Sequence, residues 1–478
     1  MQKIGEKIPG VVIAGLSGGS GKTIISLGIA AAWKKSGFTV STFKKGPDYI
    51  DAGWLSKAVG RPCYNLDTFL CRPDVVQQSY LENSEMSDVA VVEGNRGLYD
   101  GIDTDGSTST AELAKLLNLP VLLVLDCTKS TRTMAALLMG CMSFDPGIRI
   151  CGVILNRVAG KRHEGKVRAN IEKFCRIPVL GTVPKLNAKD FPERHMGLVT
   201  SAEHTFSDQA VTAAIAVAEA YIDLKGLYQT LNLKKNNSVR IPVPEVNHGE
   251  GPPEENKESD IAIGIIRDAA FQFYYPENID ALKKRGAKII YISPLNEPRV
   301  PNVDAIYMGG GFPETHAPQL AKNKSFRNHL KALSENGLPV YGECGGLIFL
   351  GESLCLEDKT YPMSGILPIK FGLAKRPQGH GYTRVDVVNK NPYFKEGEKL
   401  RGHEFRYSSV MDIEFKNHEM AFKMERGKGI LAKKDGFFKH NTFGTYTHIH
   451  ALGSPSWAKA LIRQAKSYQH SQKQSVSE

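Results

Sequence analysis

Short apolar runs alternate with stretches of helical periodicity along the first 230 or so residues. The runs are "GVVIAGL" (10–16), "DVAVVEG" (88–94), "LPVLLVLDC" (119–127), "RICGVILNRV" (149–158) and "IPVLGTV" (177–183). Helix-like stretches, such as 22–37, 109–117 and 131–142, lie between them. Buried runs that alternate with helices are typical of a parallel sheet covered on both faces, whose ligands bind at the carboxyl ends of the strands.

A second alternation begins after residue 260, which predicts a second α/β domain. Its apolar runs are "IAIGIIRD", "AKIIYISP", "VDAIYMGGG" and "LPVYGECGG". Between the two alternations, the chain is poor in large apolar residues and rich in Pro, Glu, Asn and Lys, as expected of a linker. We therefore expect a first domain at 1–232, a linker at 233–259, a second domain at 260–465 and an irregular tail at 466–478.

Composition limits the cellular setting more than the activity. The 478 residues are 41% hydrophobic, and the formal net charge of +11 suits nucleic acid, a membrane surface or an acidic small molecule equally. No two of the eight cysteines are spaced as CxxC, which favours reduced thiols and a cytoplasmic protein. The start of the chain does not resemble a signal peptide, and no apolar run is long enough for a membrane helix.

The first apolar run leads into "GLSGGSGKT" (15–23), which opens the first predicted helix. In a phosphate loop, backbone N–H groups surround phosphate oxygens, a lysine reaches the terminal phosphates, and a Ser or Thr hydroxyl holds Mg²⁺. The residues that supply these parts are Gly18, Gly19, Gly21, Lys22 and Thr23. Leu16 occupies the place of the usual first glycine, and Gly15 precedes it, so the loop is longer by one residue. A glycine-rich turn with an exposed lysine is the alternative.

Two acidic clusters follow later predicted strands. "FKKGPDYID" contains Lys44, Asp48 and Asp51, and "VVEGNRGLYDG" places Glu93 at the end of an apolar run, where a nucleotide enzyme needs a carboxylate on Mg²⁺. We expect both clusters to face the phosphates, although each could also be a turn or a strand-end charge. Asn156 follows another run, where its amide could bind an adenine edge or cap a turn.

A candidate nucleophile lies in the second half. "PVYGECGGLIFLG" places Cys344 between an apolar run and a helix, as in a strand-to-helix nucleophile turn. Backbone N–H groups near such a turn can hold an oxyanion, and Gly310 and Gly345 are the candidates. A thiol needs a base in order to attack an amide, and "GTYTHIHALGSP" offers His448 and His450. A buried structural cysteine is the alternative.

Taken together and in order, these motifs are specific. They are "GLSGGSGKT", "FKKGPDYID", "NLDTFLC", "EGNRGLYDG", "STAELAKLL", "FDPGIRICGVILNRV", "PERHMGLV", "GGGFPE", "YGECGGLIFLG", "LRGHEFRYS" and "TYTHIH". Over nearly the whole chain the sequence resembles the cobyrinic acid a,c-diamide synthase family, and the longer loop also resembles dethiobiotin synthetase. The resemblance implies a P-loop NTPase-like parallel-sheet domain followed by a class I glutamine amidotransferase-like α/β domain.

The resemblance also implies a reaction. Cys344, with His448 as base, would hydrolyse glutamine, and the ammonia would pass to the first domain. There ATP and Mg²⁺ would activate the a and c acetate carboxylates of cobyrinate, a step of cobalamin biosynthesis, as acyl phosphates that ammonia converts into amides. The family's nucleotide, metal and catalytic positions match Lys22, Thr23, Lys44, Asp48, Asp51 and Glu93; the metal ligands among these are Thr23, Asp48 and Glu93.

Departures from the family pattern leave alternatives open. His450 stands where class I glutaminases carry a glutamate, which favours a Cys–His dyad and leaves the orienting group undetermined. Asn95 and Arg96 replace an apolar pair, so they and Tyr99 are candidate substrate contacts; Arg96 could pair with a carboxylate or simply lie on the surface.

Several readings of the activity therefore compete. Siroheme and nickel-sirohydrochlorin are alternative substrates, and a partitioning-type regulatory ATPase is an alternative of another class. An inactive Cys344 in a chain that uses free ammonia is a third alternative. We expect no nucleic-acid or membrane partner and leave a homodimer open.

Overall fold

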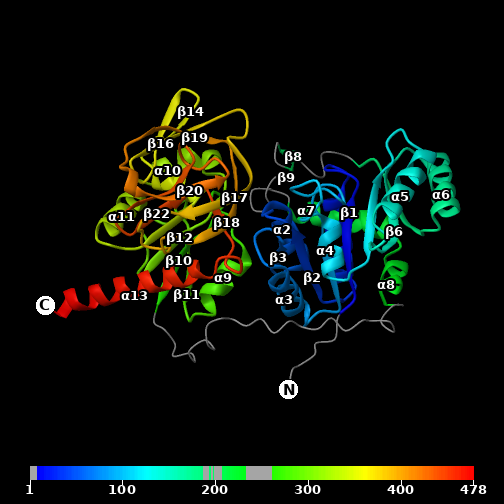
Figure 1. Cartoon of the computed structure of the whole chain (residues 1–478), viewed down its shortest axis with the longest axis horizontal. Coiled ribbons are helices and arrows are strands. Elements are labelled where there is room, and N and C mark those ends of the chain that lie inside the picture. Colours follow the sequence, from blue (N-terminus) through cyan, green and yellow to red (C-terminus); the bar gives the residue numbers. More distant parts are fainter. Residues whose placement is uncertain (1–7, 187–192, 195–196, 199–206, 233–260, 478) are drawn as a thin grey trace, which may run out of the picture. The chain divides into compact units, whose positions relative to one another are not determined.

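The computed structural model describes residues 8–186, 193–194, 197–198, 207–232 and 261–477. The chain divides into two compact units, Met1–Val246 and Asn247–Glu478, and each is described by itself. The expected linker at 233–259 lies outside the described residues. Figure 1 labels many of the elements of both units.

A parallel sheet of seven strands forms the centre of the first unit. Its strands are β1 (Gly10–Gly15), β2 (Val40–Lys45), β3 (Cys63–Leu66), β4 (Val89–Glu93), β5 (Val121–Asp126), β6 (Ile150–Val158) and β7 (Val179–Pro184). They lie in the order β3-β2-β4-β1-β5-β6-β7, so that β1 runs between β4 and β5. Every residue of β1, β2 and β4 is buried, as expected of strands covered on both faces.

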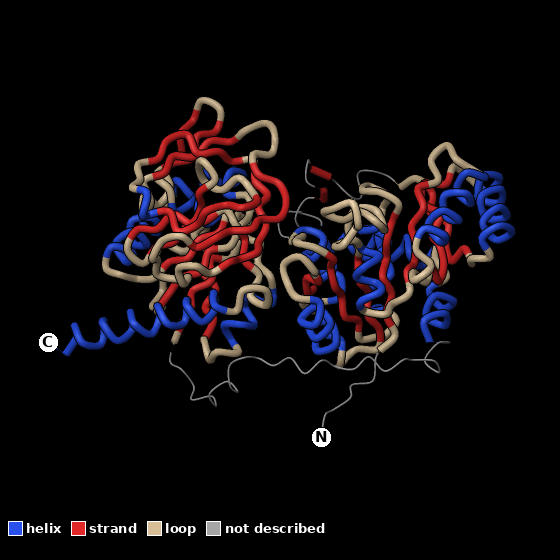
Figure 2. Tube along the Cα trace, viewed as in Figure 1, coloured by secondary structure: helices blue, strands red, loops and turns tan. Residues whose placement is uncertain are grey.

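Helices connect these strands and cover the sheet (Figure 2). They are α1 (Lys22–Lys35), α2 (Ile50–Val59), α3 (Pro73–Ser84), α4 (Thr110–Leu116), α5 (Arg132–Phe144), α6 (Lys161–Cys175), α7 (Ser207–Tyr221) and α8 (Leu224–Asn232). A short pair, β8 (Glu193–Arg194) and β9 (Gly197–Leu198), lies apart from the sheet. The glycine-rich loop joins the end of β1 to the start of α1, so it lies at the carboxyl end of a central strand.

The second unit is built on a mixed ten-stranded sheet. Its parallel part comprises β10 (Ala262–Ile266), β11 (Lys288–Ile292), β12 (Ala305–Met308), β13 (Val340–Glu343) and β22 (Thr442–Thr445). An antiparallel extension adds β17 (Gly379–Val387), β18 (Lys399–Arg406), β20 (Met420–Arg426), β21 (Lys434–Lys439) and β23 (His448–Ile449). A separate four-stranded sheet contains β14 (Ser353–Leu356), β15 (Lys359–Pro362), β16 (Ile369–Leu373) and β19 (Ser408–Ile413).

The helices of the second unit are α9 (Pro276–Lys283), α10 (Ala317–Lys322), α11 (Lys324–Glu335), α12 (Gly345–Leu350) and α13 (Ser456–Ser477), with short 3-10 turns at Pro313–His316 and Asn417–Glu419. Two large clusters of buried apolar side chains pack in this unit. One contains residues of α11 and α12, and the other residues of α9 and α13.

The predicted α/β class is confirmed, and each of the nine quoted apolar runs contains a strand. The antiparallel extension is not predicted by the alternation, because β17, β18, β20 and β21 mix buried and exposed residues and so form no continuous apolar run. The expected irregular tail at 466–478 is wrong as far as Ser477, since α13 continues through it. Polar residues there favour a helix, and the Lys473 ammonium donates to Gln469 one turn earlier. Among the described residues, no helix is long and apolar enough to cross a membrane.

Candidate functional site

The loop between β1 and α1 is shaped by close contacts that only glycine permits. A Cβ at Gly15 would collide with the Ser20 hydroxyl, which favours glycine at this position. Gly21 has a left-handed φ of 91°, and a Cβ there would collide with the Asn156 amide. The Asn156 Nδ2 donates to the Ser20 carbonyl at 2.9 Å, so Asn156 supports the loop from β6. Its predicted contact with adenine stays a prediction.

The Lys22 side chain contacts residues of the same loop. Its ammonium donates to the Ser17 carbonyl at 2.9 Å and lies 3.4 Å from the Ser20 hydroxyl. Burial lowers the pKa of Lys22, and the nearby Lys44 charge lowers it further. Glu93, Asp51 and Asp100 favour the charged form of Lys22, but its hydrogen bonds go to a neutral carbonyl and a neutral hydroxyl. An anionic phosphate group would be a more favourable partner for this buried cation.

A buried ion cluster lies at the carboxyl ends of β2 and β4. The Lys44 ammonium donates to Asp51 Oδ2 at 2.6 Å and to Glu93 Oε1 at 2.9 Å, and it lies 3.8 Å from Asp48 Oδ2. The other Asp48 oxygen accepts from the backbone N–H groups of Ile50 and Asp51 and so caps the start of α2. Thr23 joins the cluster by donating to Glu93 Oε1 at 2.8 Å. The structure therefore brings together Thr23, Lys44, Asp48, Asp51 and Glu93. These are residues of the first unit that the sequence predicts to bind nucleotide or metal or to take part in catalysis.

The cluster holds three carboxyl groups around one fully buried lysine. Burial alone would lower the pKa of Lys44, but Asp51, Glu93 and Asp48 outweigh it and raise that pKa well above its usual range. Burial would raise the pKa of Asp51, yet the Lys44 charge lowers it. Burial, reinforced by the Asp51 charge, raises the pKa of Asp48 to about 6, and burial raises the pKa of Glu93 to about 7. The site thus carries more carboxylate than it can neutralise by itself.

This surplus fits a divalent cation. Glu93 Oε2 is buried and has no hydrogen-bond donor among the described residues. The part of the chain that the structure describes contains no group of three His, Cys, Asp or Glu side chains suited to a metal. Mg²⁺ at a nucleotide needs no such group, because a loop hydroxyl, one or two carboxylates and the phosphates hold it. Thr23, Glu93 and Asp48 could therefore hold Mg²⁺ beside a bound nucleotide.

The three candidate substrate contacts differ in their placement. Asn95 exchanges hydrogen bonds with Thr110 through its backbone, and Arg96 is exposed with a left-handed φ of 51°. The Tyr99 hydroxyl instead donates to the Cys141 carbonyl in α5 at 2.5 Å, and its ring packs on Phe144. Of the three, Arg96 is the exposed side chain at the carboxyl edge of the sheet.

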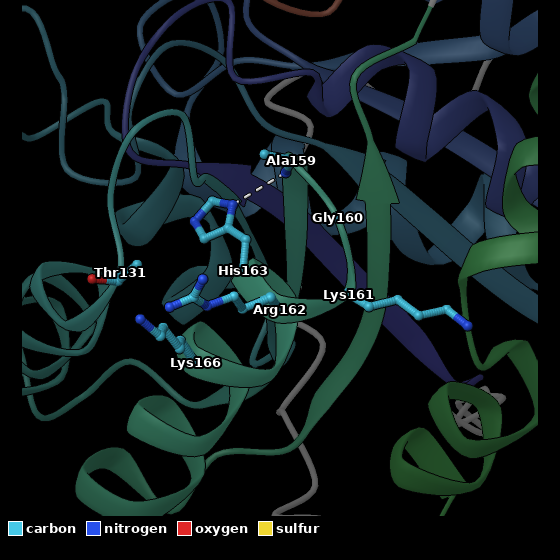
Figure 3. Close-up of a pocket in the computed structure, with 7 residues that line it drawn as sticks. All are labelled: Thr131, Ala159, Gly160, Lys161, Arg162, His163 and Lys166. Atoms are coloured by element: carbon cyan, nitrogen blue, oxygen red, sulfur yellow. Dashed lines mark hydrogen bonds between the residues drawn. The ribbon is translucent and has the colours of Figure 1, made fainter.

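A basic cavity that sequence reasoning missed follows β6. It has a volume of about 430 Å³ and is lined by residues 159–163 with Thr131 and Lys166 (Figure 3). The His163 ring holds this turn, because its Nδ1 accepts from the Ala159 N–H at 3.1 Å and its Nε2 donates to the Ser130 carbonyl at 2.5 Å. The segment "AGKRHEGK", which places three cations after a strand, was the available signal.

In the second unit, Cys344 occupies a sharp turn between β13 and α12. Its backbone has φ 49° and ψ −97°, a strained conformation for a residue with a side chain. The turn is held by the Cys344 N–H, which donates to the Thr445 carbonyl at 2.8 Å, and the side chain is 6% exposed. This is the geometry of a nucleophile turn.

His448 and Glu343 lie beside this thiol. The His448 Nδ1 is 3.5 Å from Glu343 Oε2, and both side chains are buried. Burial would lower the pKa of His448, but hydrogen bonding to Cys344 and to Glu343 outweighs it and raises that pKa to about 9. Sequence reasoning named Cys344 and His448 but missed Glu343, although it stands next to the nucleophile in "GECGG".

Further imidazoles surround His448. The His403 ring stacks on it with centroids 4.7 Å apart and an interplanar angle of 15°. Burial, together with the His448 and His450 charges, lowers the pKa of His403 well below its usual range, so this ring stays neutral. The His450 Nε2 lies 3.6 Å from Glu277 Oε1 on α9. His450 therefore lies beside a different carboxylate from the one beside His448.

The candidate oxyanion glycines also lie here. A Cβ at Gly310 would come within 2.6 Å of His448 Cε1, and a Cβ at Gly345 would come within 2.9 Å of the Gly311 nitrogen. Their role in holding an oxyanion stays a prediction, as do the catalytic roles of Cys344 and His448.

Comparison with known proteins places both units. Residues 262–456 match the CobB/CobQ-like glutamine amidotransferase domain, and residues 11–199 match the CobQ/CobB/MinD/ParA nucleotide binding domain. A cobyrinate a,c-diamide synthase of Archaeoglobus fulgidus is 39% identical over 97% of this chain and 99% of its own length. The chain belongs to the cobyrinate a,c-diamide synthase family. The relative of that name from Magnetococcus marinus is 38% identical over 96% of this chain and 97% of its own.

Family membership confirms the predicted enzyme class, a glutamine amidotransferase ligase with a nucleotide-binding domain. Among solved structures, PurLQS from Thermotoga maritima aligns with 44% of this chain and 99% of its own, at 14% identity and a TM-score of 0.33.

Proposed function

We propose that this protein uses ATP and glutamine to convert the a and c acetate carboxylates of cobyrinate into amides. One observation carries the proposal. The chain contains both a phosphate loop with a carboxylate-rich cluster and a buried Cys344–His448–Glu343 group, and relatives named for this reaction align with both units. Such an enzyme needs one site that activates an acid and another that releases ammonia.

In the first unit, the proposed reaction proceeds through an acyl phosphate. A substrate carboxylate oxygen attacks the γ-phosphorus of ATP and ADP leaves; ammonia then attacks the acyl carbon and phosphate leaves. Lys22 and Lys44 would neutralise charge on the phosphoryl oxygens, and Thr23, Asp48 and Glu93 would hold the cation. Mg²⁺, when bound, shields the negative charge of the phosphates. Burial raises the pKa of Glu93 to about 7 in the absence of a cation, and a bound cation would lower it by favouring the ionised carboxylate.

In the second unit, Cys344 releases ammonia from glutamine. Its thiol gives a proton to His448 and the thiolate attacks the carboxamide carbon of glutamine. Ammonia leaves with a proton from the imidazolium, and water hydrolyses the thioester to glutamate. The N–H groups of Gly310 and Gly345 are proposed to stabilise the oxyanion. We further propose that the basic charge serves a carboxylate-rich substrate, with Arg96 pairing with one of its side chains.

The test is product mass. The full chain is incubated with glutamine, ATP, Mg²⁺ and cobyrinate, and in parallel with siroheme or nickel-sirohydrochlorin. We expect cobyrinate to exchange two hydroxyl groups for amino groups, and no amidation of any tetrapyrrole would refute the proposal. Cys344→Ala should abolish glutamine use but keep amidation with added ammonia. Cys355→Ala, the matched change at a half-exposed thiol of β14, should keep both activities.

A further inference from the structure

The carboxylate that precedes the nucleophile faces the base. We propose that Glu343 is a positioning residue that orients His448 toward Cys344, in place of the acid that glutaminases of this class carry two residues after the histidine. In this chain that later position holds His450, an imidazole. The inference rests on the proposed function of Cys344 and His448 and adds a third member to their pair.

The Glu343 carboxylate is itself held in place by several donors. Its Oε1 accepts from the Ile449 N–H on β23 at 3.1 Å, and its Oε2 accepts from the Tyr307 hydroxyl on β12 at 3.1 Å. The side chain is fully buried at the carboxyl end of β13, so these bonds are formed out of contact with water. A buried carboxylate with fixed partners presents its negative charge in one place, which is what an orienting group requires.

The surroundings of His448 leave its ring one productive orientation. Because Nδ1 is 3.5 Å from Glu343 Oε2, the nitrogen left for the thiol is Nε2. The stacked His403 ring covers one face, and Gly310 closes the edge at Cε1. The separation of 3.5 Å is long for a hydrogen bond, but catalytic contacts of ligand-free enzymes often shorten when substrate binds.

The competing carboxylate is Glu277, which lies beside the other histidine. The His450 Nδ1 accepts from the Leu452 N–H at 3.3 Å, so its proton is on Nε2, 3.6 Å from Glu277 Oε1. The His450 ring also packs on Tyr275, with centroids 4.5 Å apart. These contacts bind His450 to α9 and to the turn after β23. Glu277 and Glu343 are thus two buried carboxylates, each next to a histidine, and they make a matched pair for substitution.

The proposed role follows from the proton that moves. When the thiol proton passes to Nε2, the ring becomes an imidazolium whose second proton is on Nδ1. Glu343 keeps that proton on Nδ1, which leaves Nε2 as the acceptor, and it stabilises the positive ring. The proton on Nε2 then leaves with ammonia. Glu343 itself gains and loses no proton.

The experiment compares Glu343→Gln with Glu277→Gln in the full chain. We expect Glu343→Gln to lower the glutaminase kcat by about a hundredfold or more while the KM for glutamine changes by less than about threefold. Glu277→Gln should keep kcat within about threefold of the unaltered chain. Amidation with added ammonia should survive in both, because it depends on the first unit. A kcat for Glu343→Gln that stays within threefold would overturn the inference.

A second readout does not depend on glutamine. Alkylation of Cys344 by iodoacetamide, followed by peptide mass, reports its thiolate as a function of pH. Loss of the Glu343 charge destabilises the imidazolium, so the alkylation midpoint should move to higher pH in Glu343→Gln and stay in place in Glu277→Gln. An unmoved midpoint in Glu343→Gln would contradict the positioning role even if kcat fell.

A further variant, Glu343→Asp, tests the inference if Glu343→Gln does not fold. If Glu343→Gln does not fold, Glu343→Asp keeps the charge but withdraws it by one methylene, and an unchanged kcat and alkylation midpoint there would overturn the inference. An unaltered chain that alkylates readily at Cys344 but neither hydrolyses glutamine nor amidates any tetrapyrrole would refute the proposed function instead.

Discussion

Glu93 offers a prediction in which function and stability oppose each other. Its carboxyl group is fully buried, and burial raises its pKa from an ordinary value near 4.5 to about 7. The Glu93 carboxyl group therefore stays protonated in the folded chain at pH values where it is ionised in the unfolded chain. The stability of the first unit must then fall as pH rises between about 4.5 and about 7, because the folded state binds more protons in that range.

The size of the effect follows from the two pKa values. One pKa unit corresponds to about 1.4 kcal/mol, so the raised pKa of Glu93 lowers the stability of the first unit, relative to acid pH, by about 3 kcal/mol at pH 8 and about 1 kcal/mol at pH 5. Glutamine resembles the protonated acid and can still accept from Thr23 and Lys44. We therefore expect Glu93→Gln to stabilise the first unit by about 3 kcal/mol at pH 8, and by about 2 kcal/mol less at pH 5.

The assay is urea unfolding of the full chain at pH 5 and pH 8, followed by tryptophan fluorescence. Trp33 and Trp54 are buried in the first unit and Trp457 in the second, so both transitions are visible. Asp105→Asn, at an exposed position of the same unit, is the control for the loss of one negative charge. Amidation with ATP and ammonia should be lost in Glu93→Gln and kept in Asp105→Asn. A stability difference that does not grow with pH would refute the reasoning.

Three further changes test the two sites. Lys44→Met leaves Asp51 and Glu93 buried without their cation. In urea unfolding at pH 8, this change should lower the stability of the first unit by about 3–5 kcal/mol. Part of that stability should return at pH 5, because the two acids are then protonated. Gly310→Ala places a Cβ 2.6 Å from His448 Cε1 and should lower glutaminase kcat at least tenfold, while amidation with ammonia, measured by product mass, is kept. Asp435→Asn removes a carboxylate oxygen that accepts hydrogen bonds from Thr445 and Thr447, next to His448 in the sequence. It should lower the stability of the second unit by about 3 kcal/mol and reduce glutamine hydrolysis.

The sequence predicted best what short segments determine by themselves. The phosphate loop and the Cys344 turn each join one strand to one helix, so their residues and geometry are encoded within about ten positions. The strands of the parallel sheets were visible for a similar reason, because burial on both faces gives each of them a continuous apolar run.

Contacts between distant segments were not predictable in the same way. Glu343 meets the N–H of Ile449 across 106 positions, and no periodicity or spacing marks that pairing. The stack of His403 on His448 depends on the register of β18 against β23, which the antiparallel extension sets. Without a way to place β18, "LRGHEFRYS" could be matched to a family but could not be assigned a position in the site.

The two sites balance charge in opposite ways, which follows from what each must bind. In the first unit, three carboxyl groups outnumber Lys44, which suits a bound cation, and the buried Lys22 suits a bound anion. A nucleotide with its metal supplies both at once. In the second unit, Glu343 lies 3.5 Å from His448. In the proposed reaction it compensates the proton that His448 receives, so a neutral carboxamide would react without any added ion. This difference in charge supports our proposal that the first unit carries out the ATP-dependent step and the second unit the glutamine-dependent step.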